Sequence, residues 1–317
     1  MTPPAIRLPN FFLAGAPKTG TTSLYAYVRQ HPGVYMSWPK EPAFFGAADI
    51  LTEPYLDPAF RRATRERDVL WAAWKGTQVP GRRALIADWE DYVALFQNVR
   101  DETAIGEATV DYFWLPSAAQ AIHAKVPTAR LLFMLRDPAE RLFSEYLARF
   151  WRHPQRRTFR AEFLAAVDRP DPWSRLRVTV GQYASHLQRF TEIFPRSQIR
   201  IHLFEDYRAH PRAVLRDIFE FLGVQPDHTI DLSLRHNETV VPRFPTLHVL
   251  RRRLFGDTSP IRWLPEGARR VLQRMYRGRR EDIAMGSADR CLLIEYYEDE
   301  IRRVADLLGR DLSAWLQ

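Results

Sequence analysis

The sequence contains a single cysteine, Cys291, and no long apolar segment. One cysteine excludes a disulfide framework and a zinc site built from several cysteines. The longest apolar runs, 11–16 and 131–135, are far shorter than the roughly 20 residues that cross a bilayer. The N-terminus also lacks the basic start and small-residue cleavage site of a secretory signal. These absences predict a soluble cytoplasmic protein without a membrane span.

Lysine is also scarce. The 317 residues include 46 Lys+Arg and 38 Asp+Glu, which gives a net charge of +8, yet only four of the basic residues are lysines. Arginine is spread over the whole chain, as a GC-rich genome would produce, although guanidinium groups also suit an anionic ligand. The basic clusters are short and accompany no nucleic-acid motif, so we expect no specific nucleic-acid partner.

Strand and helix signals alternate along most of the chain. Its composition, 46% hydrophobic and 26% charged, is typical of a globular domain and excludes a mainly disordered chain. The length fits one large domain or two small ones. Strands separated by helices predict an α/β fold with a parallel sheet and right-handed crossovers. The expected strands are 7–15, 104–108, 130–135 and 198–204, and the expected helices are 21–30, 138–151 and 212–222.

Two regions interrupt this alternation. Segments 48–100 and 225–286 are rich in proline and charge, and we expect them to leave the sheet and cover a site. Near the C-terminus, 289–308 predicts a helix whose core face holds Leu293, Tyr297, Ile301, Val304 and Leu308. Cys291 lies in the same helix and is expected to be an inert core residue.

The strongest chemical signal is the segment GAPKTGTT, which starts at Gly15 and joins a predicted strand to a predicted helix. A loop at a helix N-terminus presents unsatisfied backbone N–H groups and therefore binds anions. The glycine spacing fits the ATP- and GTP-binding pattern G-x-x-x-x-G-K-[ST]. Here, however, Thr21 stands at the lysine position, and the lysine has moved into the loop as Lys18. Thr22 occupies the position that would hold Mg²⁺.

Two segments together resemble the sulfotransferases that use 3′-phosphoadenosine 5′-phosphosulfate (PAPS). PKTGTTSL, 17–24, resembles their 5′-phosphosulfate loop. LFMLRDPAERLFSEY, 132–146, resembles their 3′-phosphate motif, with Arg136 at a strand end and Ser144 in the next helix. Both side chains would reach one rim of the sheet and hold a phosphate. The resemblance implies a P-loop-type three-layer fold, with a central parallel sheet flanked by helices, in a single domain over 1–317.

The resemblance extends to the remaining cofactor contacts. GQYASH, 181–186, resembles the family segment whose tyrosine lies near the adenine, which implies this role for Tyr183. The residues implied to bind the cofactor are Lys18, Thr19, Gly20, Thr21, Thr22, Ser23, Arg136, Ser144 and Tyr183. A further 3′-phosphate contact could come from Arg235, Arg243, Arg277 or Arg279. PAPS would be the donor and adenosine 3′,5′-bisphosphate (PAP) the product. No metal is required, because a sulfuryl group carries less charge than a γ-phosphoryl group.

A general base is implied by WPKEPAFF, 38–45, which resembles the Glu-x-x-Phe-Phe segment of the heparan-type sulfotransferases. There the glutamate is the base, which implies that Glu41 takes the acceptor's proton while Lys18 stabilises the leaving phosphate. Without the resemblance, Glu41 is interpreted as a surface carboxylate paired with Lys40. Asp111 is the reserve candidate for the base. Ala108 replaces a lysine of the heparan-type enzymes, which weakens the case for a polysaccharide substrate.

The implied reaction is sulfuryl transfer to a hydroxyl or amine of a small-molecule, carbohydrate or lipid acceptor. The aromatic-rich segment 48–100, which includes DWEDYVALF at 88–96, is expected to form the wall of the acceptor site. Its tryptophans would stack on a sugar or other ring, or pack as core. A P-loop small-molecule kinase is the enzymatic alternative, and Thr21 counts against it. A non-enzymatic anion- or nucleic-acid-binding protein is the other alternative, and it leaves the PKTGTTSL segment unexplained.

Overall fold

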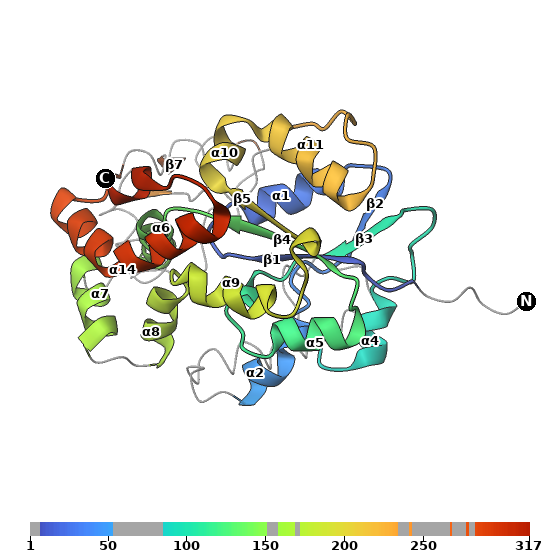
Figure 1. Cartoon of the computed structure of the whole chain (residues 1–317), viewed down its shortest axis with the longest axis horizontal. Coiled ribbons are helices and arrows are strands. Elements are labelled where there is room, and N and C mark those ends of the chain that lie inside the picture. The colour runs from blue at the N-terminus through green and yellow to red at the C-terminus, as the bar shows by residue number, and fades with distance from the viewer. Residues whose placement is uncertain are drawn as a thin grey trace, which may run out of the picture.

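A five-stranded parallel sheet lies at the centre of the molecule, with the strand order β2-β3-β1-β4-β5 (Figure 1). The computed structural model describes residues 7–52, 85–150, 158–168, 172–233, 241–242, 267, 277–278 and 283–317. The strands of the sheet are β1 (Phe11–Gly15), β2 (Val34–Met36), β3 (Ala104–Glu107), β4 (Arg130–Leu135) and β5 (Ile199–Leu203). A short antiparallel pair consists of β6 (Val241–Pro242) and β7 (Arg277–Gly278).

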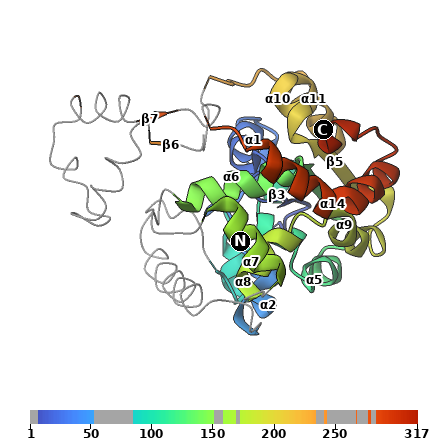
Figure 2. The same cartoon turned by 90° about the vertical axis from the view of Figure 1, so that its left-hand side faces the viewer.

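Helices cover both faces of the sheet, and this confirms the predicted three-layer α/β fold. In Figure 1, α1, α10 and α11 lie on one side of the strands and α4, α5 and α9 on the other. Figure 2 shows α6, α7, α8 and α14 at the end of the molecule that faces the viewer. The helices are α1 (Thr21–Val28), α2 (Ala47–Thr52), α4 (Trp89–Ala94), α5 (Ala118–Lys125), α6 (Pro138–Phe150), α7 (Phe159–Asp168), α8 (Pro172–Thr179), α9 (Tyr183–Thr191), α10 (Phe204–Ala209), α11 (Pro211–Leu222) and α14 (Ser287–Leu308).

The side chains of β1 alternate between two hydrophobic layers. Phe12 and Ala14 pack in the cluster with residues of α5, α9 and α14, whereas Phe11 and Leu13 pack in the cluster with residues of α1 and α11. Because successive side chains of a strand point to opposite faces, a sheet with helices on both faces needs apolar residues at consecutive positions. This requirement explains why the central strands are continuous apolar runs in the sequence.

Most predicted strands match the structure to within a few residues. β4 has the predicted bounds, and β1 begins at Phe11 instead of residue 7. Pro9 precedes it and has no N–H to donate to a sheet ladder. β2 was not predicted, since a three-residue strand is too short to show a period.

The C-terminal helix α14 was predicted, but the interpretation of Cys291 as a core residue is wrong. Cys291 is exposed, and the buried residues of α14 are Leu293, Tyr297, Ile301 and Val304. At 3.6 residues per turn, a residue two positions before Leu293 points away from that face.

The two proline-rich segments are described only in part. In segment 48–100, residues 85–100 include α4, which buries Tyr92 fully in the core. Residues 53–84 and most of 225–286 lie outside the described residues, so their role as a cover stays a prediction. No helix in the part of the chain that the structure describes is long and apolar enough to traverse a bilayer.

Candidate active site

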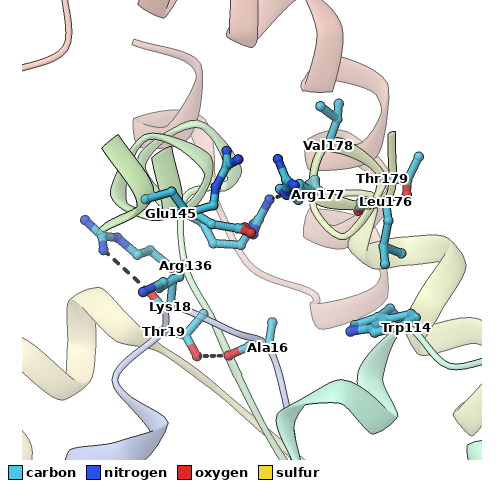
Figure 3. A network of polar contacts seen from close by, with 12 residues as sticks. Ala16, Lys18, Thr19, Trp114, Arg136, Glu145, Leu176, Arg177, Val178 and Thr179 are labelled. Atoms are coloured by element: carbon cyan, nitrogen blue, oxygen red, sulfur yellow. Dashed lines mark hydrogen bonds and ion pairs between the residues drawn. The ribbon is translucent and has the colours of Figure 1, made fainter. Parts of the chain in front are cut away.

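The loop after β1 requires glycine at both of its ends. Gly15 and Gly20 have φ of 147° and 83°, conformations that residues with a Cβ rarely adopt. A Cβ at Gly15 would lie 2.4 Å from Cβ of Phe113, and one at Gly20 would lie 2.9 Å from the ring of Phe204. Between them, the buried Thr19 hydroxyl donates to the carbonyl of Ala16 at 2.6 Å (Figure 3). The two glycines and the Thr19 hydroxyl therefore determine the conformation of the loop.

The start of α1 is suited to an anion. Gly20 is the N-cap and has no side chain, so the N-cap residue itself contributes no side-chain hydrogen bond to the first turn. Thr21, Thr22 and Ser23 form that first turn, at the positive end of the helix dipole. Lys18 lies in the loop, with φ of 67°, and is exposed. The structure thus brings the predicted lysine and the helix N-terminus together in one short segment.

Arg136 joins this loop to the end of β4. Its Nη1 donates to the carbonyl oxygen of Lys18 at 3.5 Å (Figure 3), and its Nη2 pairs with Glu140 at 3.1 Å. The guanidinium also lies 4.9 Å from the ring centroid of Phe204. Ser144, the second residue of the predicted 3′-phosphate motif, is buried in α6, 5% exposed.

Tyr183 is bonded to the backbone of Arg136. Its hydroxyl donates to the carbonyl oxygen of Arg136 at 2.8 Å, and its ring packs edge-on to Phe113 and Trp315. The side chain is only 1% exposed, and burial raises the pKa of its phenol, so the hydroxyl remains a donor. The structure therefore gives Tyr183 a role in holding the strand end, while its contact with adenine stays a prediction.

Glu41 lies on a segment that runs beside the end of β3. Backbone bonds join Ser37 N–H to Gly106 O at 2.8 Å and Glu41 N–H to Ala108 O at 2.9 Å. Lys40 Nζ lies 2.6 Å from Glu41 Oε1, so the predicted pair is present. Its interpretation as a surface pair is wrong, since the two residues are 7% and 6% exposed. A buried ammonium at this distance stabilises the carboxylate.

The reserve candidate, Asp111, is partly buried in the 3₁₀ turn η2 (Val110–Phe113). Its Oδ1 accepts a hydrogen bond from the indole Nε1–H of Trp114 at 3.2 Å. This contact gives Asp111 a structural role next to the loop after β1.

Sequence reasoning missed Glu107, the last residue of β3. Its carboxylate is fully buried and accepts hydrogen bonds from the hydroxyls of Tyr92, Tyr112 and Thr109 at 3.1, 2.7 and 2.7 Å. Burial raises the pKa of Glu107 to about 7, against the lowering effect of the three hydroxyls, and the charge of Glu41 raises it further. Burial and the charge of Glu107 raise the pKa values of Tyr92 and Tyr112, which keeps both as donors. The available signal was a glutamate at the end of a short, otherwise apolar strand.

The described aromatic residues near Glu41 pack against one another. Phe44 stacks on Tyr92 at 4.6 Å, and Trp89 stacks on Tyr92 at 5.7 Å between ring centroids. Lys125 lies 4.7 Å from the centroid of Trp89. For segment 88–96, the structure therefore favours packing as core over an exposed wall.

Two further points concern a metal site and the arginines proposed for the 3′-phosphate. Within the described ranges, no cluster of three or more His, Cys, Asp or Glu side chains is placed to hold a metal ion. The four arginines proposed for a further 3′-phosphate contact are not placed, since only the backbone of Arg277 is described, and Arg235, Arg243 and Arg279 lie outside the described residues.

Comparison with known proteins gives matches over most of the chain. The model of the Sulfotransferase family matches residues 9–228. Human bifunctional heparan sulfate N-deacetylase/N-sulfotransferase 3 is 26% identical over 324 residues, which cover 98% of this chain and 31% of the human protein. Human carbohydrate sulfotransferase 15 is 28% identical over 259 residues, or 69% of this chain and 44% of that protein. The chain thus corresponds to less than half the length of these relatives.

A solved structure agrees over the whole fold. The crystal structure of a sulfotransferase from Alicyclobacillus acidocaldarius is similar with a TM-score of 0.70 and 28% identity, over 98% of this chain and 100% of that one. The family match includes the loop after β1, Glu41 and the end of β4, so it spans the segments that carry most of the predicted site residues. The chain belongs to the sulfotransferase family.

Proposed function

We propose that this sulfotransferase transfers a sulfuryl group from PAPS to a hydroxyl or amine, with Lys18 stabilising the leaving phosphate and Glu41 acting as general base. The observation that carries the proposal is the loop after β1. It places a lysine within the loop, directly before a helix whose N-cap is a glycine, and Arg136 contacts the loop.

The residues present fit the charges of PAPS. The N–H groups of the first turn of α1 and the ammonium of Lys18 would bind the 5′-phosphosulfate. Arg136 and Ser144, on β4's end and α6, would hold the 3′-phosphate. PAPS itself supplies the sulfuryl group.

Side chains and backbone groups of this protein would supply the remaining chemistry. Lys18 and the surrounding backbone donors would neutralise the oxygen that leaves with PAP. Glu41 would accept the proton of the acceptor's hydroxyl or amine, and Lys40 stabilises its charged form.

For the acceptor we propose a carbohydrate or a related alcohol or amine. The names of two relatives, a heparan sulfate N-sulfotransferase and a carbohydrate sulfotransferase, support this class. The neutral Ala108 favours an acceptor with less negative charge than a sulfated polysaccharide. Transfer from labelled PAPS to fractionated cell extract would identify the acceptor and show whether oxygen or nitrogen is modified. The cytoplasmic location remains a prediction.

The proposed 3′-phosphate contacts can be tested by binding. Arg136→Ala and Ser144→Ala should lower the affinity for PAP much more than the affinity for adenosine 5′-phosphate, because only PAP carries the 3′-phosphate. A charge-assisted hydrogen bond is worth roughly 1.5–3 kcal/mol, so we expect about a 10- to 100-fold loss of PAP affinity by calorimetry. Equal weakening of both nucleotides would place the two residues elsewhere.

A thermal-shift titration separates the rival functions. The wild-type protein should be stabilised thermally by PAP, and much less by ATP with Mg²⁺ or by a DNA oligomer. Stabilisation by ATP with Mg²⁺ alone would support a kinase. Stabilisation by any polyanion, with strong salt dependence, would support a non-enzymatic binding protein.

A further inference from the structure

The buried carboxylate of Glu107 has no part in the proposed reaction, yet it connects two segments of the site. It lies at the end of β3 and is 0% exposed. Its Oε1 accepts from the hydroxyls of Tyr112 at 2.7 Å and Tyr92 at 3.1 Å, and its Oε2 accepts from the hydroxyl of Thr109 at 2.7 Å. A buried carboxylate with bonds of this kind has a fixed position and direction.

Two of these hydroxyls also contact the segment that follows Glu41. The hydroxyl oxygen of Thr109 accepts the N–H of Ala43 at 3.2 Å, and that of Tyr112 accepts the N–H of Phe45 at 3.2 Å. Each hydroxyl therefore accepts from a backbone amide and donates to Glu107. Because an N–H can only donate, the hydroxyl hydrogen is left to point toward the carboxylate. Glu107 thus fixes both bridges at once.

The segment held in this way has an unfavourable backbone. Glu41 and Ala43 have φ of 63° and 57°, in the left-handed region that residues with a Cβ seldom occupy. Such conformations persist where the surrounding structure holds them in place, and they concentrate at functional sites. The bonds to Thr109 and Tyr112 lie two and four residues beyond Glu41, so they restrain the turn that sets its direction.

We propose that Glu107 is a positioning residue, which holds segment 41–46 through Thr109 and Tyr112 and so orients the carboxylate of Glu41 toward the acceptor. The proposal rests on the proposed role of Glu41 as the base. Tyr92 donates to the same carboxylate, but among the residues that the structure describes its hydroxyl bonds to Glu107 and to neither bridge, and its ring stacks on Phe44. It therefore offers a matched control.

The first experiment measures the segment directly, without any substrate. Amide hydrogen exchange of Ala43 and Phe45 should be slow in the wild-type protein. Thr109→Val should speed exchange of the Ala43 amide by about tenfold or more, because it removes the hydroxyl that accepts this N–H. Glu107→Gln should speed exchange of at least one of the two amides, because glutamine has one accepting oxygen where the carboxylate has two. Tyr92→Phe removes one donor to Glu107 but neither bridge, and should leave both amides as slow as in the wild type.

The second experiment measures catalysis. Thr109→Val and Glu107→Gln should lower kcat by about 10- to 100-fold, as small displacements of a catalytic group do, with the KM for PAPS within about twofold of wild type. Thr109→Ser keeps the hydroxyl and should restore most of kcat. A merely structural role would instead lower the melting temperature and PAP affinity together, without rescue by serine.

The outcomes separate this proposal from the proposed function. Unchanged exchange of Ala43 and Phe45 in both variants overturns it, and so does faster exchange with wild-type kcat. If the wild-type protein transfers no sulfuryl group, the proposed function fails, and the exchange data alone decide whether Glu107 holds the segment.

Discussion

Lys18→Ala should lower the rate of sulfuryl transfer by about 10²–10³-fold and leave the protein folded. The lysine is exposed in the loop after β1, and its side chain fills no part of the core. Its removal takes away a positive charge from the oxygen that leaves with PAP, and losing one positioned donor of this kind costs about 3–4 kcal/mol in the transition state. Initial rates with saturating PAPS, together with a circular dichroism melting curve, would measure both effects.

The chain offers a matched control in Lys125, another exposed lysine, which lies over the ring of Trp89. Lys125→Ala should keep wild-type turnover, because it is outside the loop. A folded Lys18→Ala protein with near-normal turnover would contradict the assignment of the loop.

Glu41→Gln should lower kcat by about 10²–10⁴-fold, the usual contribution of a positioned general base. Glutamine has almost the same shape but cannot accept the proton. PAP affinity should be preserved, because the carboxylate is proposed to face the acceptor. The acidic limb of the pH–rate profile should vanish with the ionisable group. Because Lys40 would lose its buried partner, the melting temperature must be measured alongside.

Asp111→Asn is the control for this experiment. Asparagine keeps an oxygen that can accept the indole N–H of Trp114, so the fold should be maintained. Turnover and the acidic limb should both remain. If Asp111→Asn abolishes turnover while Glu41→Gln does not, the base is Asp111, and the proposal for Glu41 is wrong.

The sequence carried enough information to predict the central sheet and the anion loop. β4 is an uninterrupted apolar run buried from both sides, and the spacing of Gly15 and Gly20 is enforced by close contacts with Phe113 and Phe204. These are local requirements, so they leave a local pattern. β2 has only three residues and depends on its pairing with β3, which no local pattern shows.

The surroundings of Glu41 were less predictable for the same reason. Its burial with Lys40 depends on how segment 37–46 packs beside β3, and the bridges to Glu107 join residues more than 60 positions apart. The exposed Cys291 shows a different error, since it lies within a correctly predicted helix but away from its buried face. Long-range packing determines the burial of Glu41 and Lys40, and the rotation of α14 about its axis determines the exposure of Cys291.

The burial of Glu107 also makes its contribution to the free energy of unfolding depend on pH. Its pKa rises from 4.5 to about 7 on folding, so between these values the folded protein holds a proton that the unfolded chain has lost. The stability that this group contributes is therefore complete below pH 4.5 and is lost as the pH rises through 7, by about 2–3 kcal/mol between pH 5 and pH 8. Urea unfolding should show that Glu107→Gln gains this amount relative to wild type over the interval, and a constant difference would contradict the coupling. The contribution of Glu107 to stability thus declines over the range in which its carboxylate becomes the better acceptor for Thr109 and Tyr112, so this group favours stability at lower pH and the positioning of Glu41 at higher pH.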